Sequence, residues 1–227
     1  MLKEFVESVL SHERNLFFLL NGSDSVFLDN IMWIVSRTRV WFTFYVFVAL
    51  FLFYKTQKKK AALILLFFVL TIVLSDQISS GLIKPFFERL RPTHHPDFKD
   101  FVDIVHGHRG NGFSFVSGHA SNSFSFAVFL SMIFRNRWVT LVVFVWATLI
   151  SYSRIYLGVH FISDVVGGIV VGSLIALIMY ALFVSLQKRL FPIESIEKTN
   201  LYSEQQGKIL AAVFTLYWLG VLVYGQF

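Results

Sequence analysis

Residues 61–83 read AALILLFFVLTIVLSDQISSGLI and contain a single charged side chain, Asp76. As an α-helix this stretch would be about 35 Å long, which is enough to cross the hydrocarbon core of a bilayer. An apolar run of this length with so little charge is typical of a transmembrane helix. The stretch therefore predicts that the chain is embedded in a membrane.

The composition of the whole chain points the same way. Of the 227 residues, 56% are hydrophobic and 15% are charged, and the mean hydropathy is +0.65. A soluble domain of this size cannot bury so much apolar surface, and 27 Phe with few charges exclude a disordered chain. The lack of cysteine excludes disulfides, thiolate metal sites and cysteine nucleophiles. The net charge of +6 lies mostly beside apolar segments, so we expect the bilayer as a partner and no nucleic acid.

Five further apolar segments predict an all-α, polytopic membrane bundle of about six transmembrane helices. They are residues 40–54, 120–134, 138–152, 165–186 and 209–224. Residues 1–39 differ, because charged and apolar side chains alternate there at helical spacing and Asp24 and Asp29 oppose insertion. We expect these residues to form amphipathic helices at the membrane surface, with a seventh crossing as the alternative. No linker or repeat interrupts residues 1–227, which we interpret as one domain.

Basic side chains gather in three of the predicted connections. These are residues 55–60, 135–137 and 187–208, the last of which contains Lys198. With six spans all three connections fall on one side of the membrane, and the positive-inside rule makes that side cytoplasmic. We therefore expect a cell (inner) membrane protein whose other connections face the periplasm or the outside.

Three polar clusters stand at span ends that this topology brings to the outer face. They read KPFFERLRP at residues 84–92, SGH at residues 117–119 and SRIYLGVHFISD at residues 153–164. Lys84, Arg91 and Arg154 supply positive charges suited to the oxygens of a phosphate group. Ser117 and Gly118, at the start of a helix, add neutral hydrogen-bond donors.

Two histidines and an aspartate complete this set. His160 and Asp164 are four residues apart, so they share one face of a helix that begins near His160. The carboxylate can hold the proton of one ring nitrogen and leave the other nitrogen free as a nucleophile. His119 can protonate a leaving oxygen. Nothing in this chemistry requires a metal or another cofactor.

In their order and spacing, K-x6-R-P, S-G-H and S-R-x5-H-x3-D, the clusters resemble the type 2 phosphatidic acid phosphatase (PAP2) superfamily. The signature covers residues 84–164, and the span pattern extends the resemblance to about residues 24–186. The resemblance implies a six-helix, metal-independent membrane phosphatase with a phosphohistidine intermediate. It implies His160 as the nucleophile, Asp164 as its orienting partner and His119 as the acid. It also implies five phosphate-binding residues, namely Lys84, Arg91, Ser117, Gly118 and Arg154.

The expected activity is dephosphorylation of a membrane lipid phosphate or diphosphate at the outer face. We expect undecaprenyl diphosphate first, because the compact chain resembles bacterial undecaprenyl-diphosphate phosphatases. The alternatives are lipid A and then phosphatidylglycerophosphate or phosphatidic acid. A lipid phosphotransferase and a non-catalytic lipid binder also stay open, although a binder has no need of the His160–Asp164 pair. The sequence does not specify an oligomeric state.

Two further positions are singled out. Asp76 lies eight residues before Lys84, and a carboxylate inside a span is costly and usually functional. It can support the site from below, although a structural hydrogen bond to a neighbouring helix is the favoured interpretation. Val116 stands where the family usually has proline, and since proline offers no chemistry we expect activity to be kept.

The loop between the first two clusters also holds four histidines, His94, His95, His106 and His108. A zinc site is one interpretation, but their spacing does not fit ligands on a helix and no cysteine helps. We expect a solvated loop whose side chains contact the headgroup.

Overall fold

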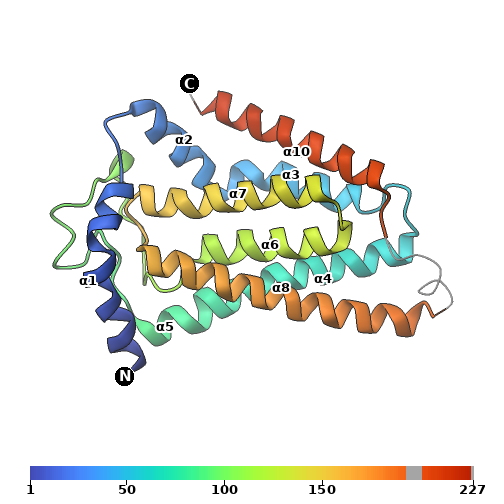
Figure 1. Ribbon diagram of the computed structural model, residues 1–227, viewed down its shortest axis with the longest axis horizontal. Coiled ribbons are helices and arrows are strands. Elements are labelled where there is room, and N and C mark those ends of the chain that lie inside the picture. The colour runs from blue at the N-terminus through green and yellow to red at the C-terminus, as the bar shows by residue number, and fades with distance from the viewer. Residues whose placement is uncertain (193–200, 226–227) are drawn as a thin grey trace.

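The predicted all-α class is confirmed. The computed structural model describes residues 1–192 and 201–225, and every regular element within them is helical (Figure 1). The elements are α1 (Leu2–Leu20), α2 (Val26–Ser36), α3 (Thr38–Phe51), α4 (Lys58–Asp76), η1 (Gln77–Ile83), α5 (Lys84–Phe87), η2 (Val105–Gly107), α6 (Gly118–Phe134), α7 (Arg137–Tyr156), α8 (Ile162–Leu190) and α10 (Glu204–Tyr224). Lys198, in the third predicted basic connection, lies outside the described residues.

Within the described residues, four helical stretches are long and apolar enough to cross a membrane. They are Lys58–Phe87, Arg137–Tyr156, Ile162–Leu190 and Glu204–Tyr224. α2 and α3 meet at a bend of 49° and qualify as a fifth span when taken together. α6 has 17 residues, or about 26 Å of helix, slightly less than a hydrocarbon core. The chain is therefore an integral membrane protein with four or five candidate spans, and six crossings stay a prediction that requires α6 as well.

The connections divide between the two ends of the bundle as the topology predicts (Figure 1). The loop after α5 and the turn between α7 and α8 lie at the end that α1 covers. The α3–α4 and α6–α7 connections, which carry the basic residues 55–60 and 135–137, lie at the opposite end. The three polar clusters are thus separated from these basic connections by the length of the bundle.

α6 lies at the centre and packs against α4, α7 and α8. Twelve of its 17 residues are buried, as expected for a helix enclosed on all sides. A Cβ at Gly172 would lie 2.0 Å from the Ser121 carbonyl oxygen, and one at Gly168 would lie 2.5 Å from that of Ser117. The two glycines therefore let α8 approach α6 closely, which is the packing role that their spacing predicts.

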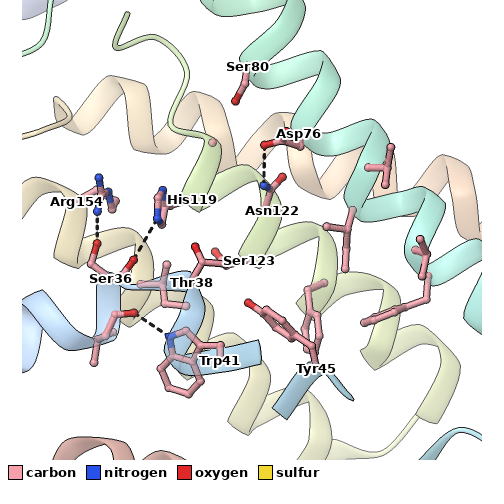
Figure 2. A pocket seen from close by; sticks show the side chains of 18 of the residues that line it. Ser36, Thr38, Trp41, Tyr45, Asp76, Ser80, His119, Asn122, Ser123 and Arg154 are labelled. Carbon is pink, nitrogen blue, oxygen red and sulfur yellow. Dashed lines mark hydrogen bonds between the residues drawn. The ribbon is translucent and has the colours of Figure 1, made fainter. Parts of the chain in front are cut away.

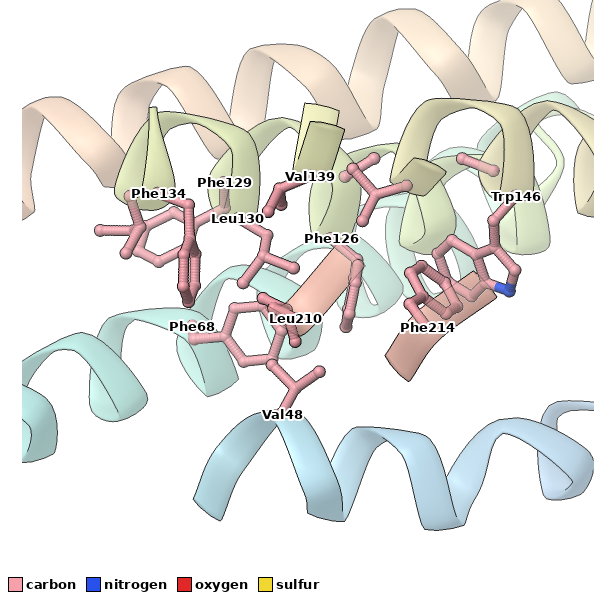
Figure 3. Close-up of a cluster of buried hydrophobic side chains, with 14 of the residues drawn as sticks. Val48, Phe68, Phe126, Phe129, Leu130, Phe134, Val139, Trp146, Leu210 and Phe214 are labelled. Atoms are coloured by element: carbon pink, nitrogen blue, oxygen red, sulfur yellow. The ribbon is translucent and has the colours of Figure 1, made fainter. Parts of the chain in front are cut away.

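On the other side of α6, aromatic rings fill the core between α6, α7, α4 and α10. The rings there include Phe68, Phe126, Phe129, Trp146 and Phe214 (Figure 3). Rings of this size bury much apolar surface each, so this part of the bundle supplies a rigid support for the polar end.

The span predicted at residues 61–83 is helical but not uniform. α4 gives way at Gln77 to the π-helix η1, which ends at Ile83. Asp76, Ser80 and Lys84 follow at steps of four residues, so they lie on one side of the helix and line the same cavity. Residue propensities do not predict such a turn, although π-turns are frequent at functional sites.

α1 is the amphipathic helix predicted near the N-terminus, but part of its apolar face is buried inside the protein. Leu10 and Phe17 pack with Phe98 and Phe161, so that α1 is docked on the outer loop and on the start of α8. Phe5 is still 66% exposed. A position at the membrane surface stays a prediction for this exposed part of the helix.

Candidate active site

The structure brings six of the eight predicted site residues to the wall of one cavity of about 580 Å³. They come from four segments: the start of α5 and the loop after it, the first turn of α6, the last turn of α7, and the α7–α8 turn. The six are Lys84, Arg91, Gly118, His119, Arg154 and His160. Ser117 and Asp164 are fully buried; Asp164 contacts His160, and Ser117 contacts Asp164.

His160 is held by Asp164. It lies in the turn directly before α8, so the helix does begin near His160 as expected, at Ile162, although His160 itself precedes its first turn. Its Nδ1 lies 3.4 Å from Asp164 Oδ2, and the same oxygen accepts from the Phe161 backbone N–H at 2.9 Å and from the Ser114 hydroxyl. This oxygen is therefore fixed by two donors besides His160 and can hold the Nδ1 proton of the histidine.

The other nitrogen of His160 faces the cations. Its Nε2 lies 3.2 Å from Arg91 Nη1, and the ring lines the cavity. Burial lowers the pKa of His160 to about 3, because the protein interior disfavours the charged ring. A neutral imidazole with its proton on Nδ1 has an electron pair on Nε2, which here accepts from Arg91 Nη1 and is the pair a nucleophile would use.

The guanidinium groups of Arg91 and Arg154 are held by the protein on one side only. Arg91 donates to the Val159 carbonyl oxygen at 2.7 Å and to that of Asn111 at 3.0 Å. Arg154 donates through Nη1 to the Ser36 hydroxyl, whereas its buried Nε has no partner among the described residues. An unpaired buried donor is costly unless a ligand completes it, and an anion with several oxygens suits this position.

His119 is connected to the same serine (Figure 2). Its Nε2 lies 3.1 Å from the Ser36 carbonyl oxygen, and since a carbonyl only accepts, this nitrogen carries a proton. Ser36, the last residue of α2, thus contacts both His119 and Arg154. The sequence analysis did not identify Ser36, because no motif precedes or follows it.

Ser117 is placed differently from the other predicted phosphate ligands. It is the N-cap of α6, where its hydroxyl accepts from the Ala120 N–H at 3.5 Å, and its own N–H donates to the Asp164 carbonyl oxygen at 2.9 Å. Ser117 therefore joins α6 to α8, while Gly118 lines the cavity. Val116 is buried, and a Cβ at Gly167 would lie 2.7 Å from its Cγ1, so this departure from the family pattern is a packing contact.

Two charged residues behind the site were not predicted. Arg89 donates to Asp164 Oδ1 at 2.6 Å and to the Ser163 hydroxyl at 2.8 Å. Glu13 of α1 accepts from the Ser163 N–H at 2.7 Å and from its hydroxyl at 2.6 Å, and it lies 3.5 Å from Arg89. α1 is thereby connected to the carboxylate that holds His160. Arg89 stands inside the KPFFERLRP stretch, where the motif treats it as a spacer.

The loop histidines hold the outer loop to the N-terminal helices. His95 Nε2 lies 2.8 Å from Glu7, His106 Nε2 lies 3.0 Å from Asn30, and the His108 ring lies 5.1 Å from that of Trp33. His95 is only 8% exposed, so it is not part of the solvated loop that we expected.

A second cavity, of about 570 Å³, opens on the loop side of the cations. It shares Ser36, Thr38, Arg91, His119 and Arg154 with the first cavity and adds Arg37 and Arg39. The cations thus lie where a mostly apolar cavity meets a basic one, an arrangement suited to a lipid with an anionic head.

Comparison with known proteins gives consistent matches. Residues 65–188 match the PAP2 superfamily. The lipid A 4′-phosphatase of Porphyromonas gingivalis is 42% identical over 184 residues, 81% of this chain and 78% of that protein. The lipid A 4′-phosphatase of Bacteroides thetaiotaomicron is 34% identical over 186 residues, 82% of this chain and 83% of that protein.

The crystal structure of LpxE from Aquifex aeolicus superimposes with a TM-score of 0.57 and 29% identity, covering 74% of this chain and 93% of that one. Because the family match spans more than half of the chain and includes all the predicted site residues between Lys84 and Asp164, this protein belongs to the PAP2 superfamily, in its branch of membrane phosphatases that hydrolyse lipid phosphate esters.

Proposed function

We propose that the protein removes a phosphate group from lipid A by way of a phosphohistidine on His160. One observation carries this proposal: Asp164 holds His160 at Nδ1 while its Nε2 lies beside Arg91 on the cavity wall. A site that only binds a phosphate needs the cations. It does not need a neutral histidine whose electron pair is directed into the site.

The reaction consists of two displacements at phosphorus. His160 Nε2 forms a bond to phosphorus, the phosphorus–oxygen bond to the lipid breaks, and the lipid oxygen takes a proton from His119. Water then forms a bond to phosphorus, the nitrogen–phosphorus bond breaks, and His119 takes a proton from that water. Lys84, Arg91 and Arg154 stabilise the charge on the phosphate oxygens in both steps.

Lipid A replaces undecaprenyl diphosphate as the best-supported substrate, which corrects our first expectation. Two relatives named as lipid A 4′-phosphatases each align over more than 80% of this chain. The basic second cavity of about 570 Å³ also suits a large sugar headgroup, with the ring of Trp33 and the guanidinium of Arg37, which lies 4.7 Å from that ring, on its wall.

The basic residues 55–60 and 135–137 support an orientation in which their end of the bundle is cytoplasmic. The site then faces the periplasm from the inner membrane. A lipid can keep its chains in the bilayer while its phosphate reaches Arg91 and Arg154.

The test is phosphate release by detergent-purified protein in the presence of EDTA. The panel contains lipid A, undecaprenyl diphosphate, phosphatidylglycerophosphate and phosphatidic acid, with H160A as the blank. We expect lipid A to be preferred and the H160A variant to be inactive. Turnover that survives in H160A contradicts the phosphohistidine, and preference for another lipid contradicts the substrate.

A further inference from the structure

The apolar part of the first cavity contains one pair of strongly polar side chains. Its walls come from α3, α4 and α6, and many of the side chains below the cations are apolar, among them Leu65, Phe68, Val69 and Val73. Asp76 of α4 and Asn122 of α6 project into this space side by side (Figure 2).

The hydrogen bond between the two side chains fixes the orientation of the amide. Asn122 Nδ2 donates to Asp76 Oδ1 at 3.1 Å, since a carboxylate accepts only from the NH2 group of the amide. Asn122 Oδ1 is buried and has no partner among the described residues. The second oxygen of Asp76 accepts no hydrogen bond from the described part of the chain either.

This arrangement is not explained by helix packing alone. The bond joins α4 to α6, as the structural interpretation of Asp76 predicted, but it leaves a buried acceptor unpaired, which is costly. Apolar side chains of similar size would join the helices without that cost. An incoming hydrogen-bond donor would satisfy Asn122 Oδ1 or the free oxygen of Asp76.

The pair lies at a defined depth below the phosphate-binding end. Asp76, Ser80 and Lys84 line the same cavity, and Asp76 is about two helical turns below Lys84. A group that reaches the pair while the phosphate is bound by Lys84 and Arg154 therefore belongs to the first carbons of a chain or to its linkage, not to its far end.

Resting on the proposed function, we infer that Asp76 and Asn122 form a subsite for a hydrogen-bond donor near the head of the substrate's chain. The donor is a hydroxyl group or an amide N–H. Asn122 Oδ1 and the free oxygen of Asp76 both accept hydrogen bonds. The carbonyl oxygen of an ester is also an acceptor and cannot bond to them, and a prenyl chain carries no hydrogen-bond donor. The pair thus selects hydroxyacyl or N-acyl lipid phosphates over ester-linked and prenyl ones.

The test compares three synthetic lipids with a phosphorylated glucosamine-type head acylated at the same carbon, C2, through oxygen in the two esters and through nitrogen in the amide. One carries tetradecanoyl through an ester, one carries 3-hydroxytetradecanoyl through the same ester, and one carries tetradecanoyl through an amide. The wild-type protein is expected to hydrolyse at least one donor-bearing lipid with a kcat/KM about tenfold or more above that of the plain ester. The two donor-bearing lipids distinguish the hydroxyl from the amide as the source.

Variants then connect the preference to the pair. D76N keeps the size of the side chain and removes the carboxylate, and N122L removes the unpaired acceptor; each is expected to reduce the preference to about one- to threefold. Y45F is the matched control, because Tyr45 is a polar side chain of the same cavity outside the pair, and it should keep the preference. The preference is a ratio of two kcat/KM values measured on the same preparation, so a smaller amount of folded protein does not change it.

Three results overturn the inference. If the wild-type protein hydrolyses all three lipids equally, the subsite is wrong while the proposed function stands. If the preference persists in D76N and N122L, the selection lies elsewhere in the cavity. If the wild-type protein hydrolyses undecaprenyl diphosphate but none of the glucosamine lipids, the proposed function is wrong and the subsite is wrong with it.

Discussion

Arg89 and Asp164 form a buried ion pair, with Arg89 Nη1 2.6 Å from Asp164 Oδ1 and side-chain exposures of 1% and 0%. The other carboxylate oxygen, Oδ2, is the one that faces His160. The two carboxylate oxygens therefore have different partners: Oδ1 binds Arg89, and Oδ2 contacts the ring of His160. Arg89 acts on the reaction only through Asp164 and is a positioning residue.

The first prediction concerns Arg89 itself. Replacing it in R89M leaves Asp164 buried without its cation, and breaking a buried pair in this way costs about 3–5 kcal/mol. We expect a lower midpoint of thermal unfolding in detergent and a fall in kcat of about 100-fold or more as Asp164 loses its orientation. R89K, which restores the charge but not the forked geometry, should recover part of the stability and less of the rate.

The control for R89M is K3M. Lys3 pairs with Glu88 at 3.1 Å, but both side chains are more than half exposed, so loss of that pair should change stability by less than about 1 kcal/mol. Wild-type stability and kcat in R89M would contradict the positioning role.

The second prediction tests Ser36. S36A removes the hydroxyl that accepts a hydrogen bond from Arg154. It keeps the backbone carbonyl that accepts one from His119. We expect kcat/KM to fall by about tenfold, mainly through KM, because in the proposed mechanism Arg154 binds phosphate in the ground state as well as in the transition state.

The matched control is S25A at the other end of α2, where the hydroxyl only caps the helix by accepting from the Leu28 N–H at 3.3 Å. Its kcat/KM should stay within about twofold of wild type. Equal effects of S36A and S25A would mean that Ser36 acts through helix stability and not through Arg154.

The meeting of the three motifs could be predicted because each motif stands at a helix end. Lys84, Arg91, His119, Arg154 and His160 were all expected to meet, and they line one cavity. The ends of transmembrane helices can be predicted from the lengths of the apolar segments. Because successive spans run in opposite directions, their order in the sequence shows which helix ends lie on the same side of the membrane.

The contacts that support this site could not be predicted in the same way. Glu13 and Ser36 reach it from the N-terminal helices, which carry no motif, and their contacts span 150 and 118 residues of sequence. Arg89 was hidden inside a motif as a spacer. The π-turn after Asp76 is not predicted by residue propensity, whereas the eight-residue spacing of Asp76 and Lys84 already indicated that Asp76 could lie below Lys84.

The third prediction is a pH dependence of stability. Burial lowers the pKa of His160 to about 3, from an ordinary value of 6.5. Between these values the unfolded chain binds a proton that the folded protein does not, so stability is present above pH 6.5 and is lost as the pH falls toward 3. The loss is at most about 1.4 kcal/mol per pH unit.

The measurement compares the thermal unfolding midpoint of wild type and H160N from about pH 6.5 to about pH 4. H160N has no titrating ring, so its midpoint should fall less steeply. Parallel pH profiles would contradict a neutral, buried His160.

The last prediction separates the structural from the catalytic role of the Arg89–Asp164 pair. D164N removes the charge that faces Arg89 and weakens the acceptor for His160, so both stability and kcat should fall. The double variant R89M/D164N leaves neither charge buried alone, and its destabilisation should therefore be smaller than the sum of the two single variants, by about 1–3 kcal/mol. Its kcat should nevertheless stay as low as that of D164N, because no carboxylate remains to orient His160. Additive stabilities would mean that the two side chains do not support one another, and recovery of kcat in the double variant would mean that Asp164 is not what prepares His160 for attack.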